Sequence, residues 1–165
     1  MAHPGRPRKC DPKVGDLSYN IRQGDYKTAK ATLAEFGIDA EDGEGRTALI
    51  NAVIDEREDF MDWLLQNGAN INHQDRIGYS ALHFIAQESW VTLAEKFLKS
   101  GANPNLPDIH GNTPLWTAIF ESVDEPGVVR LLLKYGADST IVNKYGKSPN
   151  DLYISIYGKD ISSFI

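Results

Sequence analysis

One phrase of the sequence returns at a spacing of 33 residues, and this repeat narrows the possible folds more than any other feature. Gly45, Gly78 and Gly111 mark the phrase, and a leucine stands four residues after each of them. A unit of this length is too small to bury an apolar face alone, so its stability must come from stacking on its neighbours. The sequence therefore predicts a row of similar structural repeats.

A second phrase repeats in phase with the first one. Gly68-Ala69 returns as Gly101-Ala102 and then, two residues late, as Gly136-Ala137. The delay indicates an insertion of two residues within 123–127, which would lengthen the turn between two helices. The longer turn would either make a secondary contact with a partner or have no role in binding. Two phrases that recur in phase identify a repeat far more specifically than either phrase alone.

Hydroxyl residues and glycines predict where the two helices of each repeat begin and end. A hydroxyl at the start of a first helix accepts a hydrogen bond from an otherwise unpaired amide. A glycine after a second helix readily takes the left-handed conformation that ends it. The expected first-helix caps are Thr47, Ser80, Thr113 and Ser148. The expected core consists of Ala52, Ala86 and Ala118 together with Leu49, Leu65, Leu82, Leu98, Leu115 and Leu133.

Three stretches of the chain resemble the signature of the ankyrin repeat. They read Asp42-Gly-Glu-Gly-Arg-Thr-Ala-Leu, Asp75-Arg-Ile-Gly-Tyr-Ser-Ala-Leu and Asp108-Ile-His-Gly-Asn-Thr-Pro-Leu. The resemblance implies an all-α solenoid of about five helix-turn-helix repeats, with β-hairpin-like fingers and degenerate capping repeats at both ends. The implied repeats cover 16–41, 42–74, 75–107, 108–142 and 143–165 within one domain, 16–165, and the last ends in a short helix over 160–165. Residues 1–15 are expected to form a flexible lead-in, basic and rich in proline.

Charge and cysteine usage exclude several classes of partner. The formal net charge of −6 argues against nucleic acid, because phosphate binding depends on an excess of basic residues. Cys10 is the single cysteine and cannot form an internal disulfide, which favours a cytoplasmic location. No apolar run is long enough for a signal peptide or a bilayer crossing, so we expect no membrane association.

No group of residues indicates catalysis, a cofactor or a metal site. The four histidines show neither an i, i+4 pair nor a Cys-x-x-Cys companion, which zinc sites usually have. His83 stands at the histidine position of the repeat, where a local hydrogen-bonding role is expected. Cys10 lacks the context that activates a nucleophile. We therefore expect no enzyme activity, no cofactor and no metal.

Acidic residues concentrate within residues 35–62, which hold ten carboxylates against two basic side chains. A solvated face is the ordinary role of such a run. The functional alternative is an electrostatic contact surface for a basic partner, such as a toxin or another enzyme. The sequence leaves both alternatives open.

The resemblance also implies where a partner would bind. In ankyrin repeats, partners usually meet the finger tips and the exposed side of the first helices, which line a concave groove. Several of the matching residues are apolar or aromatic, as in binding hot spots, although packing between fingers is the alternative role for each. The expected partner-binding residues are Glu44, Arg46, Asp55, Arg76, Ile77, Tyr79, Glu88, Ile109, His110, Asn112, Phe120, Glu121, Lys144 and Tyr145.

The resemblance implies a function in binding another protein. Short ankyrin proteins are frequent in bacteria, where some look like immunity proteins that neutralise a toxin. We therefore expect a monomeric binding module that inhibits or neutralises a partner protein. The alternative is a regulatory or effector adaptor that bridges cellular or host proteins through two separable surfaces.

Overall fold

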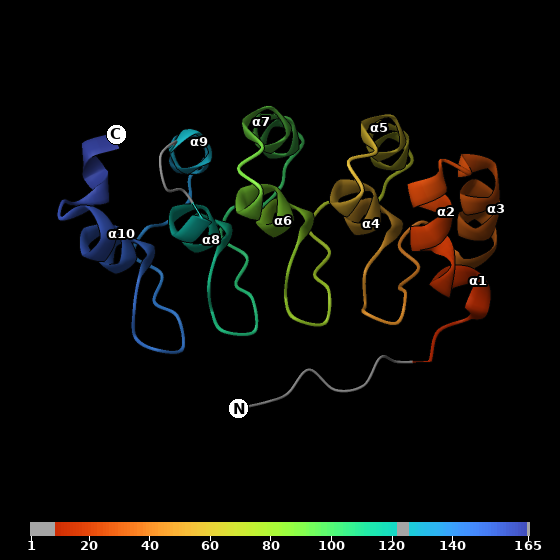
Figure 1. Cartoon of the computed structure of the whole chain (residues 1–165), viewed down its shortest axis with the longest axis horizontal. Coiled ribbons are helices and arrows are strands. Elements are labelled where there is room, and N and C mark those ends of the chain that lie inside the picture. Colours follow the sequence, from red (N-terminus) through yellow and green to blue (C-terminus); the bar gives the residue numbers. More distant parts are fainter. Residues whose placement is uncertain (1–8, 122–125, 165) are drawn as a thin grey trace. The chain divides into compact units, whose positions relative to one another are not determined.

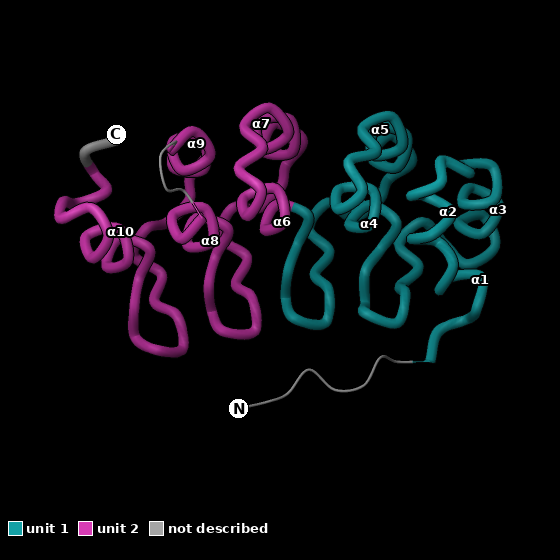
Figure 2. The backbone as a smooth tube through the Cα atoms, viewed as in Figure 1, with its two compact units in different colours: residues 1–81 teal, residues 82–165 magenta. Residues whose placement is uncertain are grey.

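The chain folds into helices that are connected by turns and long loops. The computed structural model describes residues 9–121 and 126–164. Two compact units, residues 1–81 and 82–165, are distinguished in Figure 2 and are treated separately below. The first unit contains α1 (Pro12–Gly15), α2 (Leu17–Gln23), α3 (Tyr26–Phe36), α4 (Ala48–Ile54) and α5 (Glu58–Gln66). Helix α6 (Ala81–Gln87) begins at the unit boundary, and the second unit continues with α7 (Val91–Lys99), α8 (Pro114–Glu121), α9 (Gly127–Lys134), α10 (Pro149–Tyr157) and the 3₁₀ helix η1 (Ile161–Phe164).

The predicted all-α repeat architecture is confirmed. In the first unit α4 packs on α2 and α5, and in the second unit α8 packs on α9 and α10. A long loop precedes each of α4, α6, α8 and α10 (Figure 1). These loops are the expected fingers, and within the described residues their only β-type pairing is the isolated bridge between Gln74 and Ser80.

Hydroxyl caps start the first helices as the sequence predicts. Thr47 accepts a hydrogen bond from the amide of Ile50 at the start of α4. At the start of α10, Ser148 and Asp151 form a capping box, in which each side chain accepts from the other's backbone amide. The hydroxyl of Thr113 lies 3.4 Å from the amide of Trp116. Local chemistry of the repeat phrase therefore fixes where these helices begin.

The core follows the repeat phrase, with one correction in the second helices. The expected alanines and first-helix leucines are buried, and so is Leu98. Leu65 and Leu133, however, are only half-buried, while their neighbours Leu64 and Leu132 are completely buried. The predicted core positions at Leu65 and Leu133 are therefore wrong, because each lies at the edge of the buried stripe of its helix.

The chain becomes ordered earlier than the expected lead-in allows. Asp11 caps α1 by accepting from the amide of Lys13, and Val14 in this helix is buried. The segment expected as a lead-in over 1–15 thus contains a helical turn at residues 12–15, which the sequence did not predict and which the buried Val14 anchors. Residues 1–8 of the lead-in and 122–125 of the expected insertion lie outside the described residues.

Two segments of the second unit add detail to the expected repeats. Helix α9 begins at Gly127, with Pro126 as its N-cap residue. The short helix expected over 160–165 is the 3₁₀ turn η1. No described helix combines the length and the apolar character that a bilayer crossing requires.

Candidate functional site

Each finger tip is a turn held by the first residue of the repeat phrase. Asp108 Oδ1 accepts hydrogen bonds from the amides of His110, at 2.7 Å, and Asn112, at 2.8 Å. Gly111 closes this turn with a φ of 85°, in the left-handed region that glycine adopts without strain. Asp42, Asp75 and Asn143 make the same pair of bonds in their own turns. One side chain per finger, buried in Asp75, Asp108 and Asn143 and half-buried in Asp42, therefore holds the turn and determines which neighbouring residues stand at the tip.

Backbone hydrogen bonds join neighbouring tips within each unit. In the first unit the amide of Arg76 donates to the Glu44 carbonyl oxygen at 3.0 Å, and in the second unit Lys144 donates to His110 at 2.8 Å. The tips approach so closely that a Cβ on Gly111 would lie 3.0 Å from Cα of Asn143. The paired tips of each unit therefore form a fixed surface.

Three of the charged residues expected at the partner surface of the first unit already have internal partners. Arg46 Nε lies 3.4 Å from a carboxylate oxygen of Asp75, and Arg76 donates to the Gly43 carbonyl oxygen at 3.1 Å. The Asp55 side chain is 10% exposed and pairs with Arg22, whose Nε lies 2.9 Å away. These contacts stabilise the first unit. The three side chains therefore have an intramolecular role, whether or not they also contact a partner.

The other expected residues of the first unit differ in exposure. Glu44 is exposed at its tip and its side chain has no partner among the described residues. Ile77 and Tyr79 are half-buried, which fits packing between fingers as well as contact with a partner. The exposed carboxylate of Glu44 is therefore the most accessible of these three groups.

At least five of the ten carboxylates within 35–62 form hydrogen bonds or ion pairs inside the first unit. Glu35 pairs with Lys13 at 2.7 Å, Asp39 accepts from a backbone amide, and Asp59 accepts from the hydroxyl of Tyr26 at 3.0 Å. Together with the turn-forming Asp42 and the paired Asp55, these groups stabilise the first unit. Three carboxylates of the stretch are exposed and have no side-chain partner among the described residues, namely Glu44, Glu56 and Glu58.

Two aromatic side chains expected to bind a partner are the most exposed large hydrophobic residues that the structure describes. Tyr145 at a tip is 71% exposed, and Phe120 near the end of α8 is 65% exposed. Glu88 and Glu121, at the ends of α6 and α8, are exposed as well. The second unit therefore presents aromatic side chains that its own fold does not cover.

The remaining tip residues of the second unit divide into half-buried and exposed groups. Asn112 is tied inward, because its Oδ1 accepts from Asn143 Nδ2 at 2.9 Å, and Ile109 is half-buried. His110 is exposed, and its ring lies 6.3 Å from that of Tyr145, with an angle of 24° between the planes. Lys144 is also exposed. The tips bring together His110, Lys144 and Tyr145, whereas Asn112 supports the turns.

The expected local role of His83 is confirmed. Its side chain is completely buried, and Nε2 lies 3.3 Å from the Asn112 carbonyl oxygen. Burial lowers the pKa of His83 to about 4, from an ordinary value of 6.5, so the imidazole is neutral near pH 7. His83 therefore connects α6 to a finger tip and is not available to a partner.

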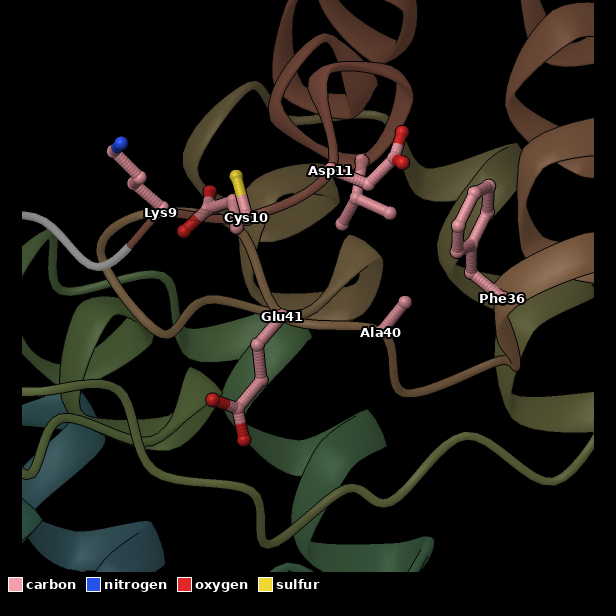
Figure 3. A pocket seen from close by; sticks show the side chains of 8 residues that line it. Lys9, Cys10, Asp11, Phe36, Ala40 and Glu41 are labelled. Atoms are coloured by element: carbon pink, nitrogen blue, oxygen red, sulfur yellow. The ribbon is translucent and has the colours of Figure 1, made fainter.

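A hollow of about 330 Å³ lies beside α1 in the first unit. Lys9 and Cys10 lie on one side of it, and Phe36 and Ala40 lie on the other (Figure 3). Cys10 is half-buried and is not part of a disulfide. Among residues 9–121 and 126–164, no group of three or more His, Cys, Asp and Glu side chains is arranged to hold a metal ion.

Two features of the surface were not foreseen from the sequence. Glu56 and Ser89, at the turns that follow α4 and α6, have left-handed φ values of 54° and 55°. The outer part of α10 exposes Ile154 and Ile156. The strained residues occupy matching places in two repeats, a signal that alignment of the repeats could have revealed.

Comparison with known proteins agrees with the architecture. The family described as "Ankyrin repeats (3 copies)" matches residues 55–143. Putative ankyrin repeat protein L92 of Acanthamoeba polyphaga mimivirus is 42% identical over 81 residues, which are 48% of this chain and 19% of that protein. Human Ankyrin repeat and SOCS box protein 6 is 32% identical over 121 residues, 70% of this chain and 29% of that protein. Human BCL-6 corepressor-like protein 1 is 32% identical over 105 residues, 63% of this chain and 6% of that protein.

The chain thus spans less than a third of each of these relatives. The family match covers the repeats themselves, and repeats of this family serve as binding modules. Repeat phrases, helix pairs and family match all agree. The chain belongs to the ankyrin-repeat family and is a protein–protein interaction module.

Proposed function

We propose that this module binds one partner protein through the accessible tips and first-helix ends, and that it inhibits the partner by occupying its surface. The observation that carries the proposal is the exposure of Phe120 and Tyr145, at 65% and 71%. Exposed aromatic side chains supply much of the free energy of protein interfaces, because a partner removes a large apolar area from water. The first-helix and tip positions therefore provide the anchor of the interface.

The charge of the first unit suggests the chemistry of the partner surface that meets it. Glu44, Glu56 and Glu58 are exposed and have no side-chain partner among the described residues, so a basic surface would gain ion pairs there. Neutralisation of a basic toxin or another enzyme is the form of inhibition that we propose. A cytoplasmic, monomeric binder would suit this role.

The proposal is tested by capturing the partner and comparing variants in a binding assay. The full chain, immobilised at its C-terminus, is used to isolate the partner, and the affinity is then measured by calorimetry. Phe120→Ala is expected to weaken binding by at least about thirtyfold, the smallest effect of an interface hot spot. Tyr19→Ala is the matched control, since Tyr19 is 64% exposed but lies outside the proposed surface.

The role of the acidic groups is tested by Glu56→Gly. This change removes a charge and also relieves a left-handed non-glycine residue, so it should not destabilise the chain. Weaker binding by a more stable variant would then report the lost charge alone. Unchanged affinity of both Phe120→Ala and Glu56→Gly would reject the proposed surface, and a partner whose activity is unaffected at saturation would reject inhibition.

An adaptor that bridges two proteins is the second candidate, and one observation favours it. Ile154 and Ile156 of α10 are 43% and 49% exposed, and neither is among the residues expected above to bind the first partner. A bridging protein would bind a second protein through such a separate group. Loss of one captured protein in Ile156→Ser, with retention of another that requires Phe120, would identify an adaptor.

A further inference from the structure

The tip of the last finger carries positive charge, although the chain as a whole is acidic. Lys144 and Lys147 are exposed on the turn that precedes α10, on either side of the exposed Tyr145. Residues 82–165 contain seven basic and nine acidic side chains. The tip is therefore positive although the second unit has more acidic than basic side chains, so the composition of the unit does not explain the charge of the tip.

The carboxylates of the neighbouring turns do not pair with these two lysines. Asp108 is buried and directs Oδ1 to the amides of its own turn. Asp151 accepts from the amide and the hydroxyl of Ser148 in the capping box, and these bonds, more than the charge of Lys147, lower its pKa. Neither Lys144 nor Lys147 forms an ion pair among the residues that the structure describes.

The aromatic and backbone framework holds this tip in place. His110 stacks with Tyr145 at 6.3 Å, and its carbonyl oxygen accepts the amide of Lys144 at 2.8 Å. The two lysine side chains thus project from a turn that is fixed to its neighbour, so little backbone order would be lost on binding. The ring of Tyr145 offers apolar area, and the ammonium groups of Lys144 and Lys147 on either side of it can donate hydrogen bonds to carboxylates.

The tip cluster is defined as His110, Lys144, Tyr145 and Lys147. We infer, on the basis of the proposed function, that the tip cluster binds an extended acidic segment of the partner protein. Glutamate or aspartate side chains of the segment would pair with Lys144 and Lys147, and the chain between them would lie across Tyr145. The partner therefore presents carboxylates to the second unit, a requirement separate from the basic surface proposed for the first unit.

Charge complementarity favours an acidic protein segment over a nucleic acid. A nucleic acid is negatively charged along its whole length, so the carboxylates of the second unit would repel it beyond the tip cluster. A short acidic segment needs positive charge only at the tip cluster itself. Within the second unit, Glu88 and Glu121 are both exposed at first-helix ends. A polyphosphate chain that extended beyond the tip cluster would meet such carboxylates.

The inference is tested by NMR titration of the full chain with a short peptide of alternating glutamate and glycine. Amide signals of residues 110 and 144–147 are expected to shift in a saturable manner, and the affinity should fall as the ionic strength is raised. Lys144→Glu should abolish the shifts, and Lys144→Gln should weaken them. Lys27→Glu is the matched control, because Lys27 is exposed on α3 of the first unit and should leave the shifts unchanged.

Two further probes make the result decisive. Tip shifts produced by an equivalent lysine–glycine peptide or by a thymidine oligonucleotide, but not by the glutamate peptide, would overturn the inference. So would glutamate-peptide shifts that persist in Lys144→Glu. With the captured partner, binding that is lost in Phe120→Ala but kept in Lys144→Glu would leave the proposed function standing and reject the acidic segment. Binding kept in both variants would reject both.

Discussion

His83 Nε2 lies 3.3 Å from the backbone oxygen of Asn112, so a completely buried imidazole hydrogen-bonds to a finger tip of the same unit. The carbonyl oxygen can only accept, which requires a proton on Nε2. Through this bond the first helix of one repeat holds the tip of the next. Stability of the fold and the shape of the candidate surface therefore depend on the same neutral side chain.

The buried histidine predicts a loss of stability in mild acid. The folded-state pKa of His83 is about 4, below the ordinary value of 6.5, so between these values the unfolded chain binds a proton that the folded chain does not. The free energy of unfolding should therefore fall by about 3 kcal/mol as the pH drops from 6.5 to about 4. Urea unfolding at several pH values measures this slope.

The control for this slope is His83→Gln. The variant should be less stable near neutral pH but should lose less stability on acidification than the wild type, since it has no titrating group at this position. Equal losses in both proteins would show that other residues cause the acid sensitivity.

Two glycines with similar backbone angles should differ in their tolerance of alanine. Gly111 and Gly136 have φ values of 85° and 87°, but a Cβ on Gly111 would lie 3.0 Å from Asn143 and one on Gly136 would meet no atom within 4 Å. We expect Gly136→Ala to cost about 1 kcal/mol from the left-handed conformation and Gly111→Ala roughly 3 kcal/mol, because the neighbouring backbone must also move. Urea midpoints of the two variants test the difference, which similar costs would contradict.

The left-handed residues Glu56 and Ser89 predict sites for stabilisation. Their φ values of 54° and 55° strain a side chain that has a Cβ. Glycine at either position should raise the free energy of unfolding by about 0.5–1 kcal/mol, after allowance for its greater freedom in the unfolded chain. As a control, Ala31→Gly, at an exposed position in the interior of α3, should lower stability by about 1 kcal/mol. A loss of stability in Glu56→Gly would mean that the strain is offset by contacts of the glutamate.

Adjacent leucines of α9 should respond differently to truncation. Leu132 is completely buried, whereas Leu133 is only half-buried. Leu132→Ala should cost about 2–5 kcal/mol by removing core contacts and leaving a cavity, and Leu133→Ala less than about 1.5 kcal/mol. Thermal or urea unfolding of both variants separates the two positions. A larger effect at Leu133 would contradict the assignment of the buried stripe.

The repeat phrase alone predicted much of the architecture. Hydroxyls at Thr47 and Ser148, and glycines such as Gly111, act through bonds within a few residues, so the sequence contains all the information needed to place them. The same reasoning failed at Leu65 and Leu133, because adjacent apolar residues on a helix differ in burial only through what packs against them. The helical turn at 12–15 was also missed, since its anchor is the burial of Val14.

The partner-binding residues remain a prediction that the resemblance to the family implies. The sequence by itself determined an ankyrin-repeat array and its helix starts, because these follow from local patterns that recur. Only the tertiary structure decided which of those residues remain accessible: Asp55 is paired with Arg22 and Asn112 with Asn143, whereas Phe120 and Tyr145 are left exposed. The reason is physical, since pairing and burial depend on contacts between residues about one repeat apart, and a one-dimensional pattern does not specify which side chains meet.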